Sequence, residues 1–330
     1  MTNQTRPPRY LVGVDLGGAK MLAGIYDETI RRVDTVKRST KSDRGPAAVI
    51  ERIARCIRDV IDEADARVHD VRAVVVGVPG KVDRKAGWVV QSDVLGWADV
   101  PLVDRLQEAI GLPVLIENDH QLATLGVYTL ELKSRPRRLL GLFIGARIGG
   151  GWLVDGNLCE GFAEVTEAIG HLMLDPKGPR CRCGGHGCFE SLASRHAVLD
   201  QIHRAMLLGR RTVLEEALDG LGRLRAKDLF RAYRGGDALT CEVIDSAARW
   251  IRVALANLVE TLKPEVVVLG GGMTEVIREA LRDSIFRSGV EGHETPTIDD
   301  VPVWISSLGD EACLAGAALL ARQHGEVNNE

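Results

Sequence analysis

Two segments of the sequence each contain an apolar strand, a glycine-rich turn and a second apolar strand. The first, RYLVGVDLGGAKMLAGIYD, starts at Arg9, and the second, RLLGLFIGARIGGGWLVDGNL, starts at Arg138. This order indicates a hairpin rather than a strand that leads directly into a helix. Because helical and buried-strand patterns also recur along the chain, the repetition predicts two related α/β halves.

Composition narrows the class of protein. The 330 residues fit two domains, and 45% hydrophobic with 27% charged residues is typical of a folded globular chain. A net charge of −4 provides no basic surface for nucleic acid or an anionic membrane, so we expect small-molecule partners. No apolar run is long enough to span a bilayer, which predicts a cytoplasmic protein. Four cysteines stand alone in apolar patterns and are expected to be buried: Cys56, Cys159, Cys241 and Cys313.

Three glycine clusters are candidates for phosphate binding. DLGGAK lacks both the P-loop spacing and the G-x-G-x-x-G of a dinucleotide fold. Taken singly, each cluster is typical of an ordinary turn. Successive backbone N–H groups in tight turns can nevertheless form an anion-binding concavity, and three turns would be enough to hold a nucleoside triphosphate. The clusters are Asp15–Lys20, Gly145–Gly151 and Leu269–Met273.

A polar pair, Asn118-Asp119, directly follows the buried strand in LPVLIEND. Ligands of open α/β sheets bind at such carboxyl ends of strands. Asn and Asp are also favoured helix N-caps, and this stretch alone favours the cap. A carboxylate here is well placed to accept a proton from a substrate hydroxyl.

Three cysteines occur within eight residues of HLMLDPKGPRCRCGGHGCFE, which spans residues 171–190. Cys181, Cys183 and Cys188 with one histidine form the Cys3His donor set typical of structural zinc. His171 and His186 compete as the fourth ligand. The alternative, a cluster of free thiols, is disfavoured because thiols beside Arg180 and Arg182 would be activated and oxidised. Four protein ligands leave no open position, so the metal is expected to shape the loop rather than catalyse.

In chain order, these segments resemble the ROK family of bacterial sugar kinases and sugar-responsive repressors. The resemblance covers about residues 9–323 and is most specific in IGH followed by CRCGGHGCFE, the zinc signature. GVPGKVD, LGW, LPVLIEND, IGGGWLVDG, PEVVVLGGG and LGDEACLAGAALLA follow in family order. The resemblance implies the actin-like ATPase and sugar kinase fold, with two α/β lobes around a central cleft, and ATP-dependent phosphorylation of a hexose-like substrate.

The resemblance also implies roles for individual residues. Asp119 matches the catalytic base, Asp15 lies near Mg²⁺, and structural Zn²⁺ would be held by His171, Cys181, Cys183 and Cys188. The sugar would contact Gly80, Asp93, Asn118, Asp119, His171 and Glu190. ATP would contact Asp15, Gly17, Gly18, Ala19, Lys20, Ala146, Arg147, Gly149, Gly150, Gly270, Gly271 and Gly272. Zinc would then order a loop whose two ends, His171 and Glu190, face the sugar.

Several positions depart from the family pattern. Ala19 replaces a usual Thr, and Ala146-Arg147 replaces Thr-Gly, so two hydroxyl donors to phosphate are missing. Arg147 could compensate with its guanidinium or obstruct the turn. The family glutamate that contacts the C1–C2 end of the sugar is replaced by Ala168, with Glu167 one place away. This loss argues against plain glucose. Asp93 stands where the family often has Asn, and His120 directly follows the base. Both residues alter the same side of the implied sugar site.

Three functions are therefore in competition. They are a hexose kinase, a kinase for a cyclitol or amino sugar in secondary metabolism, and a non-catalytic sugar-binding regulator. ROK repressors carry an N-terminal helix-turn-helix, whereas here the first strand begins almost at the N-terminus. We expect an N-terminal lobe over 1–118, onto which a C-terminal helix of about 312–330 packs, and a larger lobe over 119–311 with the zinc loop. A homodimer or higher homo-oligomer is expected by analogy.

Overall fold

Two β-sheets form the framework of the protein. The computed structural model describes residues 9–159, 168–215, 224–285, 297–298 and 300–327. The chain divides into two units. Among the described residues, unit 1 takes 9–135, 151–159 and 310–327, and unit 2 takes 136–150 and 168–309 with its gaps.

Unit 1 is built on a five-stranded sheet with the order β3-β2-β1-β4-β8. Its strands are β1 (Tyr10–Leu16), β2 (Lys20–Asp27), β3 (Arg32–Ser39), β4 (Val71–Val78) and β8 (Val114–Asn118). The pair β1–β2 is antiparallel, which confirms the first predicted hairpin. β1, β4 and β8 run parallel. A small antiparallel sheet follows β4 and comprises β5 (Lys81–Asp83), β6 (Trp88–Ser92) and β7 (Trp97–Val100).

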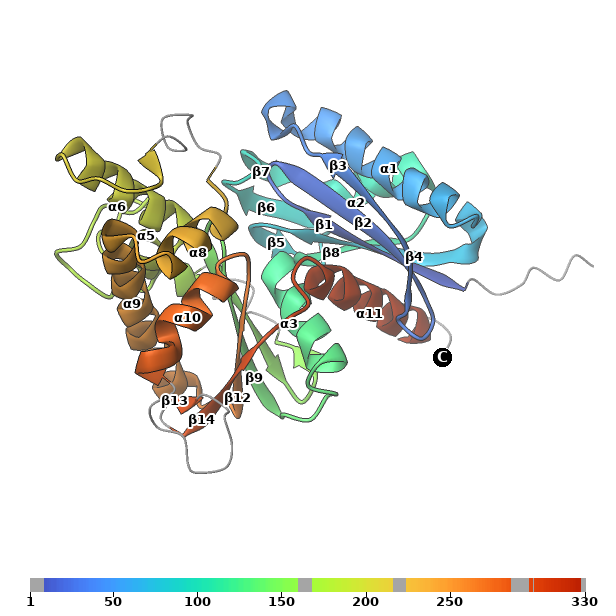
Figure 1. Cartoon of the computed structure of the whole chain (residues 1–330). Helices are drawn as coiled ribbons and strands as arrows, with labels where there is room; N and C mark the ends of the chain where they lie inside the picture. Colours follow the sequence, from blue (N-terminus) through green and yellow to red (C-terminus); the bar gives the residue numbers. More distant parts are fainter. Residues whose placement is uncertain (1–8, 160–167, 216–223, 286–296, 299, 328–330) are drawn as a thin grey trace, which may run out of the picture. The chain divides into compact units, whose positions relative to one another are not determined.

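Helices cover both faces of the five-stranded sheet (Figure 1). They are α1 (Gly45–Glu63), α2 (Leu102–Ile110), α3 (Asp119–Leu130) and α11 (Glu311–Val327). Val12 and Val14 pack in one apolar core with the buried face of α1, which includes Val49, Ile53 and Ile57. The intervening Gly13 faces α11, because a Cβ there would lie 2.6 Å from the Leu314 carbonyl oxygen. Alternate residues of β1 therefore face opposite sides of the sheet, one covered by α1 and the other by α11.

α3 and α11 cross with their backbones almost in contact. A Cβ on Gly316 would lie 1.8 Å from the Leu122 carbonyl oxygen, so only glycine fits at this crossing. The small residues of LGDEACLAGAALLA thus allow the two helices to pack closely. Because α3 packs on α11, unit 1 extends through residue 135, beyond the expected boundary at 118. The last three residues of the expected helix, 328–330, lie outside the described residues.

The second sheet has the order β11-β10-β9-β12-β14-β13. Its strands are β9 (Arg138–Ile144), β10 (Ile148–Val154), β11 (Asn157–Leu158), β12 (Val266–Gly270), β13 (Thr297–Ile298) and β14 (Val301–Ile305). β12 runs parallel to β9 and β14. The helical elements of unit 2 are η3 (Ile169–His171), α5 (Phe189–Ala193), α6 (Arg195–Leu207), α8 (Ala226–Arg234), α9 (Ala238–Leu262) and α10 (Thr274–Ile285).

Among the described residues, no helix is both long and apolar enough to cross a membrane. The isolated cysteines behave partly as expected. Cys56 and Cys313 are buried, whereas Cys159 and Cys241 are only partly buried.

Candidate active site and metal centre

The parallel strands of unit 1 end together at one edge of the sheet. Asp15 of β1 pairs with Gly77 of β4, which pairs with Glu117 of β8. The turn after β4 and the Asn118-Asp119 pair after β8 therefore lie at the same edge as Asp15. Ligands of open α/β sheets bind at such an edge.

Asn118 is the N-cap of α3, as the sequence favoured. Its Oδ1 accepts hydrogen bonds from the backbone N–H groups of His120 at 2.9 Å and Gln121 at 3.2 Å. Its Nδ2 donates to the Gly80 carbonyl oxygen at 3.1 Å. Since an amide offers two acceptor and two donor positions, one N–H remains available for a ligand. The cap also fixes Asp119 as the first residue of α3.

Gly80 and Asp93 lie on the loops around this cap. Gly80 has φ +136°, and a Cβ there would lie 2.3 Å from the Gln91 carbonyl oxygen, so the position requires glycine. Its fixed carbonyl in turn orients Asn118. The exposed Asp93 accepts a hydrogen bond from Gln91 Nε2 at 3.0 Å.

Asp15 is surrounded by other acidic groups. Burial, followed by the charges of Asp119 and Asp310, raises the pKa of its carboxyl to about 7, while Lys20 opposes the rise. Lys20 forms an ion pair with Asp310. Hard oxygen ligands that repel one another suit a divalent cation such as Mg²⁺, whose charge would favour the ionised carboxylate. The donor set therefore fits the predicted magnesium position.

We predict that Asp15→Asn stabilises the protein at pH 8 relative to wild type but has less effect at pH 5. Because the folded-state pKa of Asp15 is raised from about 3.8 to about 7, the wild type loses stability as pH rises from about 4, where the unfolded carboxyl ionises, to about 7, and the loss is complete above pH 7. Three pKa units correspond to about 4 kcal/mol, of which we expect roughly half because the carboxyl is partly exposed. Urea unfolding at both pH values, without nucleotide or Mg²⁺, measures the difference. Asp62→Asn on the exposed side of α1 is the control, and an equal shift at both pH values would contradict the prediction.

The first glycine turn closes the β1–β2 hairpin. The Gly17 N–H donates to the Lys20 carbonyl oxygen at 2.9 Å. Thr40, fully buried, donates its hydroxyl to the Gly17 carbonyl at 2.6 Å and its N–H to the Ala19 carbonyl at 3.0 Å. Sequence reasoning missed Thr40 and assigned no role to Asp310. Each is distant in sequence from the turn that it holds, and no local pattern indicated the contact.

The other two glycine clusters lie next to each other in unit 2. β9 and β12 are parallel, with Phe143 beside Gly270, so the turns that follow them share one sheet edge. The Met273 N–H donates to the Ile144 carbonyl oxygen at 2.9 Å. The turn after β9 comprises residues 145–147, whereas Gly149 and Gly150 lie within β10 and are buried. The turn itself therefore contains only Gly145, and the other glycines of this cluster belong to the strand β10.

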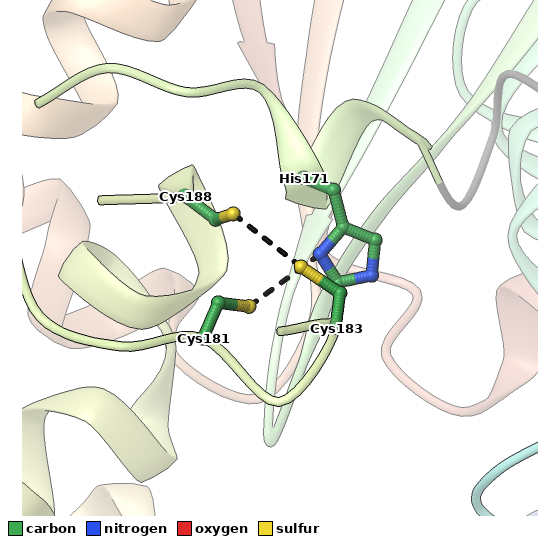
Figure 2. Close-up of side chains that lie close together, drawn as sticks. All are labelled: His171, Cys181, Cys183 and Cys188. Carbon is green, nitrogen blue, oxygen red and sulfur yellow. Dashed lines mark hydrogen bonds between the residues drawn. The ribbon is translucent and has the colours of Figure 1, made fainter. Parts of the chain in front are cut away.

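His171 and three cysteines of the zinc loop gather in unit 2 (Figure 2). Their ligand atoms all lie within 4.8 Å of one another. Cys181 Sγ is 3.6 Å from His171 Nδ1, and Cys183 Sγ is 3.6 Å from Cys188 Sγ. A tetrahedral zinc ion would place two sulfurs about 3.8 Å apart and a sulfur and a nitrogen about 3.6 Å apart. The four side chains therefore fit a tetrahedral metal.

The geometry also distinguishes the two candidate histidines. His186 lies at the surface, with Nδ1 3.4 Å from the Gly178 carbonyl oxygen, and is not in the cluster. Burial raises the pKa of the Cys188 thiol to about 12 and also raises that of Cys181. A cation would be needed to hold these groups as thiolates, and a coordinated metal supplies that charge.

His171 and Glu190 connect the cysteine cluster to the rest of unit 2. Figure 2 shows Nδ1 of His171 directed at the sulfurs and its other ring nitrogen on the far side. A metal on Nδ1 leaves Nε2 as an N–H donor. Glu190, 8% exposed, accepts a hydrogen bond from the Ile148 N–H at 3.2 Å through Oε2.

Comparison with known proteins gives relatives over nearly the whole chain. A glucokinase from Streptomyces coelicolor is 32% identical over 319 residues, which cover 94% of this chain and 97% of that protein. A ROK hexokinase from Thermus thermophilus is 32% identical, with a TM-score of 0.72 over 97% of this chain and all of that one. A ROK family glucokinase from Streptomyces griseus, in complex with glucose and AMPPNP, is 30% identical, with a TM-score of 0.79 over 95% of this chain and 99% of that one. These structures confirm the actin-like ATPase and sugar kinase fold. The ROK family matches residues 11–324, and the chain belongs to this family.

Proposed function

We propose that this protein is an ATP-dependent carbohydrate kinase that transfers a phosphoryl group to a hydroxyl of a hexose-like substrate. The proposal rests chiefly on Asp119, a carboxylate held by a helix N-cap at the edge of the sheet where Asp15 also lies. The whole-chain likeness to glucokinases supports the same reaction.

Asp119 is the proposed general base. Its Oδ1 accepts a hydrogen bond from the His120 N–H at 2.9 Å, which fixes the carboxylate. Its Oδ2 would accept the hydroxyl proton as the sugar oxygen attacks the γ-phosphorus of ATP. Positioning and charge stabilisation would supply most of the rate enhancement.

The proposed sugar contacts are those that the family resemblance implies. The remaining N–H of Asn118, the carboxylate of Asp93 and the backbone of Gly80 would bind hydroxyls. The metal-bound ring of His171 would donate through Nε2, and Glu190 would accept. The N–H of Ile148 already occupies one oxygen of Glu190, so the other is the one available to sugar.

The proposed ATP contacts are the glycine turns. Residues 15–20, 145–150 and 270–272 would surround the phosphates and the adenosine, and Asp15 would hold Mg²⁺, which offsets phosphate charge. Arg147 stands where relatives of this family usually carry glycine, and its guanidinium can bond two phosphate oxygens at once. A cytoplasmic location fits this use of ATP, and a homodimer is proposed by analogy and can be tested by light scattering.

The proposal is tested with purified protein, Mg-ATP and a panel of hexoses, amino sugars and cyclitols, with ADP release as the measurement. We expect turnover of at least one compound well above an Asp119→Ala control. Absence of such turnover across the panel would contradict the kinase function and favour a non-catalytic sugar-binding regulator. That alternative is motivated by Ala19, Ala146 and Arg147, which lack the usual hydroxyl donors.

We further propose that the substrate differs from glucose at its C1–C2 end, as a cyclitol or an amino sugar does. Ala168, exposed at the start of η3, offers no acceptor where the family carries a glutamate, and Glu167 lies outside the described residues. We predict that Ala168→Glu raises kcat/KM for glucose by about tenfold or more, because a charged acceptor of a hydroxyl contributes about 1.5–3 kcal/mol. Ala168→Gln is the matched control for side-chain size. Glucose turnover by the wild type that equals that of every analogue would contradict the proposal.

A further inference from the structure

A surface pocket lies beside the zinc loop, where α5 and α6 begin. It is a small hollow of about 60 Å³ that opens to solvent. Its polar lining includes Arg180, Arg182, Ser191, His196, Gln201 and Arg204. Its lining also includes Cys181 of the cysteine cluster and Glu190, but neither His171 nor any residue of unit 1, so apart from Glu190 it is distinct from the proposed sugar and phosphate contacts.

Three guanidinium groups line this pocket. Arg180 and Arg182 alternate along the chain with the cluster residues Cys181 and Cys183, and Arg204 lies on α6. None of the three arginines forms an ion pair with a carboxylate in the described part of the chain. The pocket therefore offers three forked cationic donors, none of which forms an ion pair with the acidic lining residues Asp200 and Glu190.

One further feature makes the pocket attractive to an anion. The positive end of the α6 dipole lies at the pocket, because Ser194 and Ala197 at the start of the helix line it. Burial, and then the charges of Arg182 and Arg195, lower the pKa of His196, so its ring offers a hydrogen-bonding group rather than a charge. The acidic lining residues are Asp200 and Glu190, and Glu190 is already bonded to the Ile148 N–H.

We propose that this pocket binds a phosphorylated small molecule whose phosphate is held by Arg180, Arg182 and Arg204, and that binding acts on the turn of residues 145–147. Guanidinium forks match phosphate oxygens in pairs, which favours phosphate over a carboxylate or a halide. Ser191 and Gln201 can bond hydroxyls of the remainder of the molecule. Inorganic phosphate and a sugar phosphate share this chemistry.

Two hydrogen bonds connect the pocket to that turn. On one side, Glu190 of α5 accepts the Ile148 N–H at 3.2 Å. On the other side, the Arg195 N–H at the start of α6 donates to the Gly145 carbonyl oxygen at 2.9 Å. A ligand that fixes the first turns of α5 and α6 therefore fixes both flanks of the turn. The effect on catalysis rests on the proposed kinase function, whereas binding itself does not.

Binding is tested by calorimetry with inorganic phosphate, a hexose 6-phosphate and the unphosphorylated hexose, at constant ionic strength. Arg204→Gln is the principal variant, because Arg204 belongs to α6 and not to the cysteine-containing loop. Arg252→Gln, an exposed arginine on α9 outside the pocket, is the matched control. We expect the affinity for the phosphorylated probes to fall about tenfold or more in Arg204→Gln and to be unchanged in Arg252→Gln. Equal affinity in all three proteins, or no binding to the wild type, would overturn the proposal.

The two phosphorylated probes distinguish the source of the phosphate. Tighter binding of inorganic phosphate favours the free ion, and tighter binding of the sugar phosphate favours a metabolite. Hydrogen exchange at residues 145–148 then tests the coupling to the turn. We expect the tighter probe to slow exchange in wild type and Arg252→Gln but not in Arg204→Gln. Where kinase activity is present, adding the tighter probe should change the KM for ATP by about fivefold in wild type and in Arg252→Gln. Bound probe without slower exchange would refute the coupling, and this result does not depend on kinase turnover.

Discussion

Replacement of Asp119 with Asn is expected to lower kcat for sugar phosphorylation by about 10²–10⁴-fold, the usual contribution of a general base. The amide cannot accept the hydroxyl proton, yet it can keep the 2.9 Å hydrogen bond from the His120 N–H that fixes the side chain. KM values for sugar and ATP should therefore change little. Initial rates of ADP release over a range of both substrates measure the two parameters separately.

The control for this variant must separate chemistry from folding. Asn118→Asp keeps an N-cap for α3 but loses the N–H that bonds the Gly80 carbonyl oxygen, so it perturbs the same helix start without removing the base. We expect Asn118→Asp to raise the KM for sugar more than it lowers kcat. An Asp119→Asn protein that retains wild-type kcat would remove Asp119 from the reaction.

The sequence predicted the elements that depend on local patterns. The β1–β2 hairpin and the Asn118 cap both follow from residues close to one another in the sequence. Regular spacing and cap chemistry act over such short distances. The position of Asp119 at the end of a buried strand was predictable for the same reason.

Contacts between distant residues were not predictable from single segments. The Lys20–Asp310 ion pair joins residues 290 positions apart, and Thr40 bonds a turn 23 positions away. The pattern GARIGGG also did not distinguish a turn from a packed strand. A Cβ on Gly150 would lie 2.7 Å from the Gly141 carbonyl oxygen, so that glycine serves strand packing. The sequence spacing of the cysteines likewise did not decide whether His171 or His186 is the fourth ligand. The structure places His171 in the cluster.

We propose that the cluster of His171 and three cysteines holds one structural Zn²⁺, and we predict that losing the ion disorders the loop. Structural zinc contributes about 10–16 kcal/mol in small peptides, far more than the roughly 1 kcal/mol of one hydrogen bond. Among the described residues, the loop has little regular structure of its own between η3 and α5. Its ends are His171 and Glu190, so its disorder should also weaken sugar binding by at least about tenfold.

Elemental analysis of purified protein should give about one zinc per chain. In Cys188→Ser, we expect zinc to be lost, the melting temperature to fall, and residues 172–187 to become sensitive to protease. Cys241→Ser is the matched control, because this partly buried thiol of α9 only bonds the Tyr233 carbonyl oxygen, which a serine hydroxyl can replace. The 3.6 Å spacings of the ligand atoms fit a tetrahedral ion, whose charge would favour the thiolate of Cys188 although burial raises the pKa of its thiol. Metal-free protein with unchanged melting temperature and sugar affinity would show that hydrogen bonds alone order the loop.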